Sequence, residues 1–584
     1  MNLAFNVVDH NCDVCVVGGG MAGICTAISA ARHGANVILM HDRPVLGGNS
    51  SSECRVHISG ADIHGKNPNL RETGILEELR LDNVKMNPNE YYPIWDFVLY
   101  NKAITQDGLK LLLNCSCQDA EMKENSIESI TGWQLTTQTF QKVKAKVFVD
   151  CSGDGILAPL TGALYRIGRE ARDEFNESIA PVKADNKTMG MTCLFQAVDT
   201  GTPQKYEPPR WAYSYESDDE LPYGANDHNW WRMGYWWIEL GGEQDSIADT
   251  EKLRDELLKI TLGVWDHIKN KGDHGAENWA LEWIQFLPAK RESRRYIGKH
   301  ILTQNDIESG GQFDDVVAYG GWSMDDHHPA GFNATKLGHP ATIFHPAPSP
   351  YGIPLRAFIS KNIDNLMFAG RCASATHAAM SSTRVMGTGC SMGQAVGTAI
   401  ALSLNENLKI DTYEEFIKKL QQALLKDDCY IPNIKYEISE ITKNAELSSN
   451  QGNPEPIRDG INRPIGEDNH CWECSEGDWV SYTFNQEIDI SEVRLILDSS
   501  LDKHITLSLH KQYNERISQI PITLPKSFEL EALKDECWNR ITLIEDNYQR
   551  LVKIPLSIRT RGIRFKLHST WGAEKTKLFA FYLD

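Results

Sequence analysis

The sequence predicts an α/β domain that is interrupted by an inserted α+β domain and followed by a C-terminal β-sandwich. Three observations predict this arrangement. Residues 13–42 follow the order strand, glycine turn, helix and strand, which is a βαβ unit. A buried strand at 362–371 and a small-residue helix at 387–404 come later in the chain. From about 445 onward, short alternating strands separated by turn residues are typical of a β-sandwich.

The length and composition fit a globular protein of more than one domain. The chain has 584 residues, of which 41% are hydrophobic and 24% are charged, so two or three domains are expected. We expect four segments, which are 1–164, 165–355, 356–438 and 445–584. The first and third form the α/β domain, the second forms the insertion, and the fourth forms the sandwich. The formal net charge of −20 argues against nucleic acid or an anionic membrane as a partner.

Cysteine usage and apolar runs bear on the location of the protein. No apolar run approaches the roughly 20 residues of a membrane helix, and the first residues lack the pattern of a signal peptide. The 14 cysteines are scattered, which is typical of a reduced, cytoplasmic protein. Cys12 and Cys15, like Cys471 and Cys474, have CxxC spacing, but neither pair has the further ligands that zinc needs. We therefore expect structural cysteines and no bound metal.

Three glycines lie between the first strand and the helix, and each has its own role. Gly18 permits a tight turn, Gly20 lets the backbone approach a pyrophosphate, and Gly23 lets helix and strand pack closely. The helix opens with Met21 and Ala22, so its N–H groups and positive dipole end face the phosphates. In a full βαβ unit this pattern predicts a dinucleotide site.

The second strand ends in an unusual way for such a site. An acid normally accepts a hydrogen bond from the ribose at this position, but His41 stands there and Asp42 follows it. A neutral imidazole can accept as well as donate. Either His41 or Asp42 can therefore serve the ribose, and the sequence leaves the choice open.

Three further segments resemble parts of flavoproteins with two dinucleotide-binding motifs. They are RPVLGGNSSSECRVHISGA (43–61), VFVDCSGDG (147–155) and NLMFAGRCASATHAAMSSTRVMGTGCSMGQAVGTAIAL (365–402). From about 10 to 435, the chain resembles the FAD-dependent oxidoreductases related to fumarate reductase and aspartate oxidase. The fold implied by this resemblance is a Rossmann-like, GR2-type FAD-binding domain with an inserted substrate domain.

The resemblance implies FAD as the cofactor and also implies which residues hold it. In the branch with R-E-S-R-R and G-R-C-x-S-x-x-H motifs, a neutral acceptor followed by Asp-Arg often replaces the strand-end acid, which favours FAD over NAD. The cofactor-binding residues expected are Gly18, Gly20, Met21, Ala22, Gly23, His41, Asp42, Arg43, Gly47, Gly48, Asn49, Ser50, Ser152, Gly153, Asp154, Gly370, Arg371, Met386, Gly387 and Gly393.

Charged residues in segments 288–306 and 320–331 are candidates for catalysis. Positive charge at Arg294 or Arg295 would stabilise reduced flavin or clamp a carboxylate or polyol, and a solvated basic strand is the alternative. In GGWSMDDHHPAG, we expect His327 to be the general base and Asp325 to orient it, and a polar loop is the alternative.

The last flavin segment adds further candidates through the resemblance. It implies that His377 and Arg384 face the flavin or the substrate. Cys372 or His377 could form a covalent link to the flavin, but non-covalent FAD is expected. The alternating residues at 53–57 are expected on an extended strand with one face toward the flavin.

Tryptophans raise the question of carbohydrate binding. Four fall within 229–242, where they form either a sugar platform or a strand core, and core is favoured for whichever of Trp236 and Trp237 faces inward. The last segment resembles discoidin-like, galactose-binding jelly rolls in its RDG, DWVSYTF and VRLILDS stretches. Trp472 and Trp571 could stack on a sugar there, but such modules also serve only as support.

The function expected is that of an FAD-dependent oxidoreductase. It would transfer a hydride between flavin N5 and a small polar substrate, such as a carbohydrate or a sugar-derived acid. The alternatives are a flavin-dependent isomerase, hydratase or lyase without net redox change, and a glycan-binding protein with a vestigial nucleotide site. An NAD-only dehydrogenase lacks support from 43–61 and 365–402. The electron acceptor, the direction of reaction and homo-oligomer formation are left open.

Overall fold

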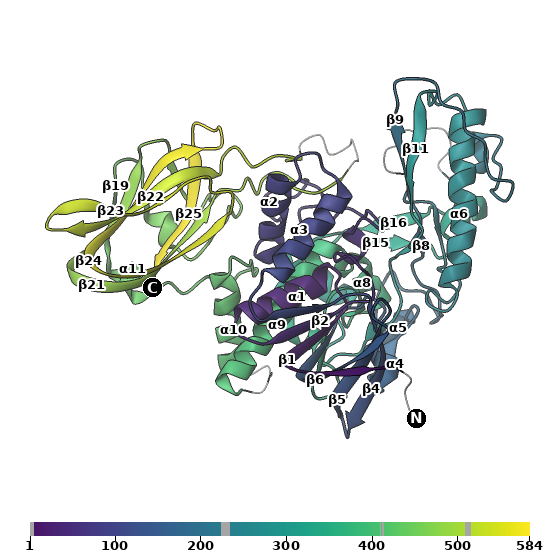
Figure 1. Ribbon diagram of the computed structural model, residues 1–584, viewed down its shortest axis with the longest axis horizontal. Coiled ribbons are helices and arrows are strands. Elements are labelled where there is room, and N and C mark those ends of the chain that lie inside the picture. The colour runs from purple at the N-terminus through teal and green to yellow at the C-terminus, as the bar shows by residue number, and fades with distance from the viewer. Residues whose placement is uncertain (1–4, 223–233, 409, 411–413, 509–515) are drawn as a thin grey trace.

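The computed structural model describes residues 5–222, 234–408, 410, 414–508 and 516–584, which form three regions (Figure 1). An α/β domain occupies the centre, the insertion with helix α6 lies on one side of it, and the C-terminal β-sandwich lies on the other. Trp230 and Trp231 of the aromatic run lie outside the described residues. Within the described ranges, no helix is both long enough and apolar enough to cross a membrane.

The central domain is built on a seven-stranded sheet. Strand β1 (Val7–Val17) pairs in parallel with β2 (Val37–Met40) and β6 (Thr139–Asp150), so Val14 lies opposite both Val37 and Val147. The order is β3 (Leu109–Leu112), β2, β1, β6, β5 (Ser126–Gln134) and β4 (Cys115–Lys123), and β18 (Leu366–Phe368) pairs in parallel with the end of β6. The predicted βαβ unit and the predicted strand at 362–371 are confirmed.

Helices α1 (Met21–Arg32) and α9 (Met386–Glu406) pack on each other with unusually close backbones. A Cβ atom at Gly393 would lie 2.2 Å from the carbonyl oxygen of Ala22, so only glycine fits there. The small residues of the predicted helix at 387–404 therefore serve this contact. Helices α2 (Ile75–Met86) and α3 (Tyr92–Ile104) were not predicted, and α10 (Glu414–Lys426) packs on α9.

The insertion has a hydrophobic core of its own, which includes Phe195, Trp237, Trp265 and Phe332. Trp237 is therefore the inward-facing member of its tryptophan pair. The elements are β8 (Met191–Thr192), β9 (Phe195–Asp199), β10 (Glu239–Leu240), α6 (Thr250–Asp266), β11 (Trp279–Ile284), β12 (Ala289–Lys290), β15 (Met324–His327) and β16 (Thr342–His345). Apolar residues of 302–324 and 351–359 pack instead in the core of the central domain, so the separate core covers less than 165–355.

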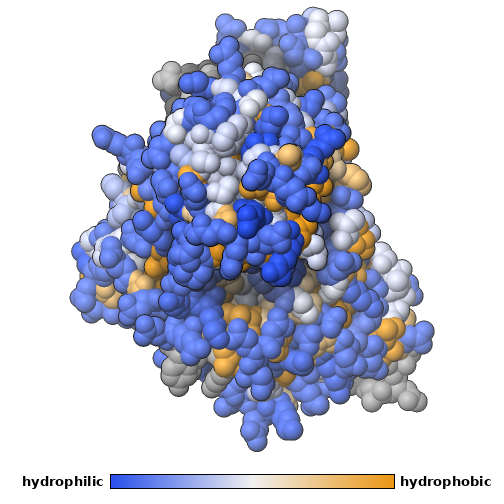
Figure 2. All heavy atoms as spheres, turned by 90° about the vertical axis from the view of Figure 1, so that its left-hand side faces the viewer, coloured by the Kyte–Doolittle hydropathy of each residue, from blue (hydrophilic) through white to orange (hydrophobic). Residues whose placement is uncertain are grey.

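The C-terminal domain is an antiparallel β-sandwich with its own core. Its strands are β19 (Glu446–Ser449), β20 (Trp472–Cys474), β21 (Trp479–Leu497), β22 (Pro525–Lys534), β23 (Cys537–Ile544), β24 (Leu551–Thr570) and β25 (Thr576–Leu583). Trp472 is 1% exposed and belongs to this core, so its ring does not offer a surface for a sugar to stack on. Figure 2 shows the outer face of the sandwich as mostly hydrophilic, with small scattered apolar patches.

The sandwich is joined to the central domain by buried ionic contacts. Arg71 pairs with Glu77 at 2.7 Å, and the same guanidinium donates hydrogen bonds to the carbonyl oxygens of Ser499 and Ser500. Asp62 pairs with His504 at 2.5 Å in an equally buried position. Leu507 of the same segment belongs to the core of the central domain. The segment 498–508 therefore completes the central domain rather than only touching it.

Trp571 also lies at this junction. Its ring packs against the ammonium group of Lys85 on α2, 5.0 Å from the ring centre, and against that of Lys526 at 4.9 Å. The indole N–H donates to the carbonyl oxygen of Asn547 at 2.6 Å. The ring is therefore engaged in holding the two domains together.

Replacing Arg71 should destabilise the whole chain, because Glu77 and three carbonyl groups would remain buried without their cation. We expect Arg71→Met to lower the free energy of unfolding by about 3–5 kcal/mol, measured by urea unfolding. The control is Arg32→Met, which removes a partly exposed pair with Glu78 and should cost no more than about 1 kcal/mol. Equal losses for the two variants would contradict a special role for Arg71.

Candidate functional site

The glycine turn after β1 has the geometry of a phosphate-binding loop. Gly18 has φ +104°, and a Cβ atom there would lie 2.5 Å from the backbone of Cys151 and Ser152 at the end of β6. A Cβ atom at Gly23 would lie 1.9 Å from the carbonyl oxygen of Gly18. A Cβ atom at Gly20 would meet nothing within 4 Å. Gly18 and Gly23 are thus required by packing, whereas Gly20 faces open space in front of the first N–H groups of α1.

The structure distinguishes the roles of His41 and Asp42. The backbone N–H of Gly19 donates to Nδ1 of His41 at 3.0 Å, and Nε2 lies 3.1 Å from the carbonyl oxygen of Val45, so Nε2 carries the proton. Burial lowers the pKa of His41 and keeps the ring neutral. The ring therefore joins the glycine turn, through Gly19, to the segment after β2, through Val45. The Asp42 side chain, by contrast, is 62% exposed, and it lines the cavity that opens in front of the glycine turn.

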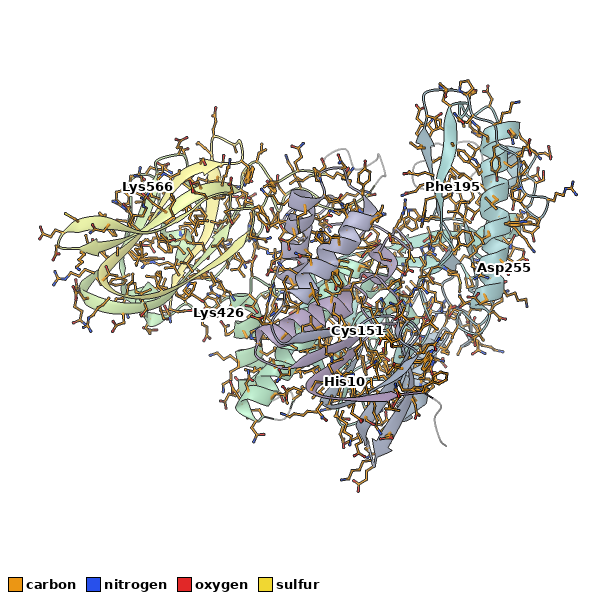
Figure 3. All side chains as sticks on the ribbon, in the orientation of Figure 1. His10, Cys151, Phe195, Asp255, Lys426 and Lys566 are labelled. Atoms are coloured by element: carbon orange, nitrogen blue, oxygen red, sulfur yellow. The ribbon has the colours of Figure 1, made fainter. Side chains whose placement is uncertain are left out.

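A cavity of about 900 Å³ begins at this turn. The expected cofactor residues that line it are Gly18, Gly20, Met21, Ala22, His41, Asp42, Gly47, Gly48, Asn49, Ser152, Gly153, Asp154, Gly370, Arg371 and Met386. Figure 3 places Cys151, another lining residue, in the middle of the molecule, between the sandwich with Lys566 and the insertion with Phe195.

The other expected cofactor residues lie behind the lining. Gly23 and Gly393 allow close packing of α1, as described above. Arg43 pairs with Glu53, and the hydroxyl of Ser50 donates to the carbonyl oxygen of Gly47 at 3.0 Å. Gly387 donates its N–H to the carbonyl oxygen of Ser59 at 2.8 Å.

Asp154 and two cations form a charged group beside the turn. Its carboxylate pairs with Lys290 at 2.7 Å and with Arg371 at 2.9 Å. Burial alone would raise the pKa of Asp154, but Arg371 and Lys290 outweigh it and lower the pKa. The carboxylate is thus ionised, and one positive charge of this group remains unbalanced, which suits an anionic pyrophosphate.

The wall contributed by the insertion carries a second buried charge cluster. Nδ1 of His327 lies 2.6 Å from Oε2 of Glu239, and Nε2 lies 3.3 Å from Oδ2 of Asp325. Arg291 approaches the same Glu239 at 3.3 Å, and Arg384 approaches Asp325 at 3.0 Å. His327, Asp325, Arg291 and Arg384 line the cavity, with Glu239 behind them.

These surroundings favour the protonated form of His327. Burial opposes the charge, but Glu239 and then Asp325 outweigh burial and raise the pKa of His327. A general base must start neutral, so this environment suits a proton donor better than the expected base. Asp325 does hold the ring, as expected, and its own pKa is lowered because the neighbouring His327 and Arg384 outweigh burial.

The remaining catalytic candidates do not line the cavity. Arg295 is fully buried, pairs with Glu170 at 3.0 Å and lies 3.2 Å from Glu292. Arg294 donates to the carbonyl oxygen of Asp154 at 3.1 Å. His377 is held between Glu292 at 2.8 Å and Asp326 at 3.1 Å.

Neither candidate for a covalent link reaches the cavity. Cys372, like His377, is absent from its lining, and the Cys372 side chain is fully buried. Burial raises the pKa of the Cys372 thiol well above its usual range. A buried, protonated thiol outside the cavity is a poor nucleophile.

Several lining residues were missed or misplaced by sequence reasoning. His64, Lys66 and Phe344 line the cavity but belong to no recognisable motif, and Trp322 lines it from the GGWSMDDHHPAG segment without having been singled out. The expected extended strand at 53–57 is wrong, because Arg55 has φ +55° and the segment forms no strand.

An aromatic group forms another part of the wall. His57 lines the cavity, and its ring lies edge-on to that of Trp236 at 5.4 Å. The ring of His64 lies 5.0 Å from those of both His57 and Trp322. Trp236 is thus the member of the tryptophan pair that faces the cavity, while Trp237 faces the core. The tryptophan pair gave a signal in the sequence, although the sequence did not show which ring faced inward.

The fold, the uncapped glycine turn and the cavity define a dinucleotide-binding flavoprotein. A family model described as "FAD dependent oxidoreductase" matches residues 13–424, and the chain belongs to this family. Its cofactor is therefore FAD, and the open space at Gly20 and the unbalanced cation beside Asp154 fit a dinucleotide pyrophosphate.

Other comparisons give more limited likenesses. Over 88 residues the chain is 32% identical to flavin-containing amine oxidase A of Equus caballus, which covers 15% of this chain and 17% of that protein. A geranylgeranyl bacteriochlorophyll reductase-like protein from Thermoplasma acidophilum is 12% identical, with a TM-score of 0.32 over 72% of this chain and 85% of that one. A family 32 carbohydrate-binding module from Streptococcus pneumoniae is 13% identical, with a TM-score of 0.20 over 25% of this chain and 99% of that one.

Removing the Asp42 carboxylate should weaken FAD binding, because His41 is already engaged and cannot replace it. A hydrogen bond to a charged group contributes about 1.5–3 kcal/mol, so we expect Asp42→Ala to raise the Kd for FAD roughly 10- to 100-fold. Binding is measured by quenching of flavin fluorescence on titration of the apoprotein. Asp13→Ala, which changes an acid of the same βαβ unit outside the cavity lining, is the control. An unchanged Kd for Asp42→Ala would assign the ribose contact elsewhere.

The ion pairs of His377 should make stability depend on alkaline pH. Burial lowers the pKa of His377, but Glu292 and Asp326 outweigh it and raise the pKa to about 10. A raised histidine pKa stabilises the fold fully below the unfolded value of about 6.5, and this stabilisation is lost as the pH rises toward 10. We expect the stability difference between the wild type and His377→Gln, measured by urea unfolding, to shrink between pH 6.5 and 10. A pH-independent difference would contradict a charged His377.

Proposed function

We propose that this protein transfers a hydride between FAD and a small anionic substrate of the size and polarity of a sugar-derived acid. The observation that carries this proposal is the charge of the cavity wall. Among the described residues, two arginines and a protonated histidine, Arg291, Arg384 and His327, pair directly with two carboxylates, Glu239 and Asp325. One positive charge is left over in a chain whose formal net charge is −20.

An excess cation in a buried wall supports an anionic ligand for a physical reason. A charge away from water is strongly unfavourable unless it is paired, and a substrate carboxylate would complete the pairing. Arginine also matches the planar carboxylate with two parallel hydrogen bonds. Arg384 and Arg291 are both within the lining, so either can present such a pair.

The aromatic part of the wall supports a carbohydrate-like body for the substrate. Trp236 and His57 provide an apolar surface against which sugar C–H groups can pack. Phe344 on β16 lines the cavity and is 60% exposed, so the cavity opens to solvent beside this ring. These rings and the excess cation lie in the same cavity, so a sugar acid can use both.

FAD supplies the hydride chemistry when it is bound, and the chain's own residues position the substrate and handle the proton. Nδ1 of His327 is held by the short contact to Glu239, whereas the Nε2 contact to Asp325 is longer. We infer that Nε2–H donates its proton to a substrate that accepts a hydride. In the opposite direction this nitrogen must first lose its proton, and the same two carboxylates stabilise it when the proton returns.

The test begins with the purified protein containing FAD, mixed anaerobically with sugar acids and with the matching neutral sugars. Loss of the visible flavin band with an acid, or its return after prior chemical reduction, supports hydride transfer. A substrate that is converted while the flavin spectrum ends as it began would favour the isomerase, hydratase or lyase alternative. A neutral sugar that reacts as well as its acid would contradict the proposed role of the excess cation.

Arg384 gives the matching variant test. We expect Arg384→Gln to raise KM for the acid roughly 10- to 100-fold, the equivalent of one charge-assisted hydrogen bond, while the neutral sugar is little affected. Steady-state kinetics with both substrates measure this difference. Arg254→Gln, on the exposed face of α6, is the control for removal of one positive charge.

A further inference from the structure

A group of metal-ligating side chains lies in the insertion, away from the FAD cavity. Asp218, His267 and His274 each offer one ligand atom, and none of the three lines the cavity. Oδ1 of Asp218 lies 2.8 Å from Nε2 of His267 and 3.2 Å from Nε2 of His274, and the two imidazole nitrogens are 3.1 Å apart. We propose that these three residues bind a structural Zn²⁺ ion.

The spacing of the three atoms fits a shared tetrahedral ion. With zinc–nitrogen and zinc–oxygen distances of about 2.0–2.2 Å, two ligand atoms of a tetrahedral site lie about 3.3 Å apart. The three observed separations are within about 0.5 Å of that value. Small rotations of the side chains would therefore admit the ion. A water molecule or another protein atom can supply the fourth ligand.

The donors and acceptors of His267 and Asp218 also favour a cation between these groups. Nδ1 of His267 lies 2.9 Å from the carbonyl oxygen of Tyr215, which can only accept, so this nitrogen carries the proton. In the neutral form of the ring, Nε2 is a lone pair that faces the Asp218 carboxylate at 2.8 Å and Nε2 of His274 at 3.1 Å. A zinc ion would bond to both the Nε2 lone pair and the Asp218 carboxylate, so the two would no longer repel each other. The Tyr215 carbonyl would then accept the Nδ1–H hydrogen bond that metal-bound histidines usually make. The rival is an imidazolium–carboxylate pair without metal.

The backbone around the cluster is adapted to bring the two imidazoles together. His267 begins a π-helical turn, His267–Lys271, at the end of α6, and such turns are frequent at functional sites. Gly272 follows with φ −89° and ψ 152°, a conformation open to any residue. A Cβ atom there would nevertheless lie 2.2 Å from Nε2 of His274 and 3.1 Å from Nε2 of His267. A side chain at position 272 would therefore displace the His274 imidazole from its place beside His267.

The proposed ion would join two parts of the insertion. Asp218 begins the 3-10 turn Asp218–Glu220, whereas His267 begins the π-helical turn at the end of α6 and His274 follows that turn. His267 is 1% exposed and lies beside Tyr215 of that core. A metal at this point would fix the end of α6, and the wall that carries Trp236 and Glu239 belongs to the same domain.

The experiment measures zinc and flavin in the same purified full-length protein. The wild type, His267→Gln, His274→Gln and the control His300→Gln are incubated with ZnCl₂, dialysed into metal-free buffer and analysed by mass spectrometry. His300 makes a comparable pair with Asp306 at 3.0 Å outside the cluster. We expect one zinc ion per chain in the wild type and in His300→Gln. We expect the two cluster variants to lose it, with affinity falling by more than the roughly 10- to 100-fold that an outer partner costs.

Two further variants separate metal binding from a failure to fold. His274→Cys should retain zinc, because a thiolate is itself a zinc ligand, and Gly272→Ala should lower retention by crowding both imidazoles. FAD content shows that each variant has folded around its cofactor. Treatment with a chelator should lower the thermal midpoint of the wild type to that of His274→Gln. A zinc-loaded wild type that keeps no zinc on dialysis, or glutamine variants that keep as much as the wild type, would overturn the proposal in favour of the ion pair.

Discussion

At the glycine turn, the backbone of Gly18 lies in close contact with the end of β6 and with the start of α1. The rest of the structure depends on this close contact. The end of β6 leaves no room for a side chain at Gly18, and α1 leaves none at Gly23. On its other face, α1 is just as close to α9 at Gly393. Three distant parts of the chain, the β1–α1 unit, the end of β6 and α9, are therefore held at fixed positions, and the cavity lies where they meet. Its phosphate-facing part is rigid because it is made of backbone.

The cavity combines this rigid part with a wall whose properties come from buried charges. The insertion brings Glu239 and His327 together and the central domain brings Arg384, so the cluster exists only when both are in place. Each ion limits the protonation of its neighbours: Glu239 keeps His327 charged, and Arg291 helps to keep Glu239 ionised. Binding of an anion there would therefore change the protonation of several groups together.

Much of the central domain could be predicted because its signals are local in sequence. The βαβ unit, the returning strand β18 and the small residues of α9 are short patterns with direct physical meanings. Sequence could not place Glu239 beside His327, because the two are 88 residues apart and Glu239 lies in no recognisable motif. The ambiguity at His41 had a similar cause, since its role depends on the N–H of Gly19 and the carbonyl of Val45. Helices α2 and α3 were missed because their buried faces contact other helices and the sandwich, and α2 also carries several charged residues.

The docking of the sandwich has a consequence for how the chain is made. Arg71 and its carbonyl partner at Ser499 are 428 residues apart, and Leu507 fills a place in the core of the central domain. During synthesis, the central domain must therefore wait with part of its apolar core uncovered until the ribosome has extended the chain past this segment. Domains that fold from the N-terminus onward usually avoid such a delay. For this protein, the interval between translation of the two segments is the period in which chaperones have most to protect.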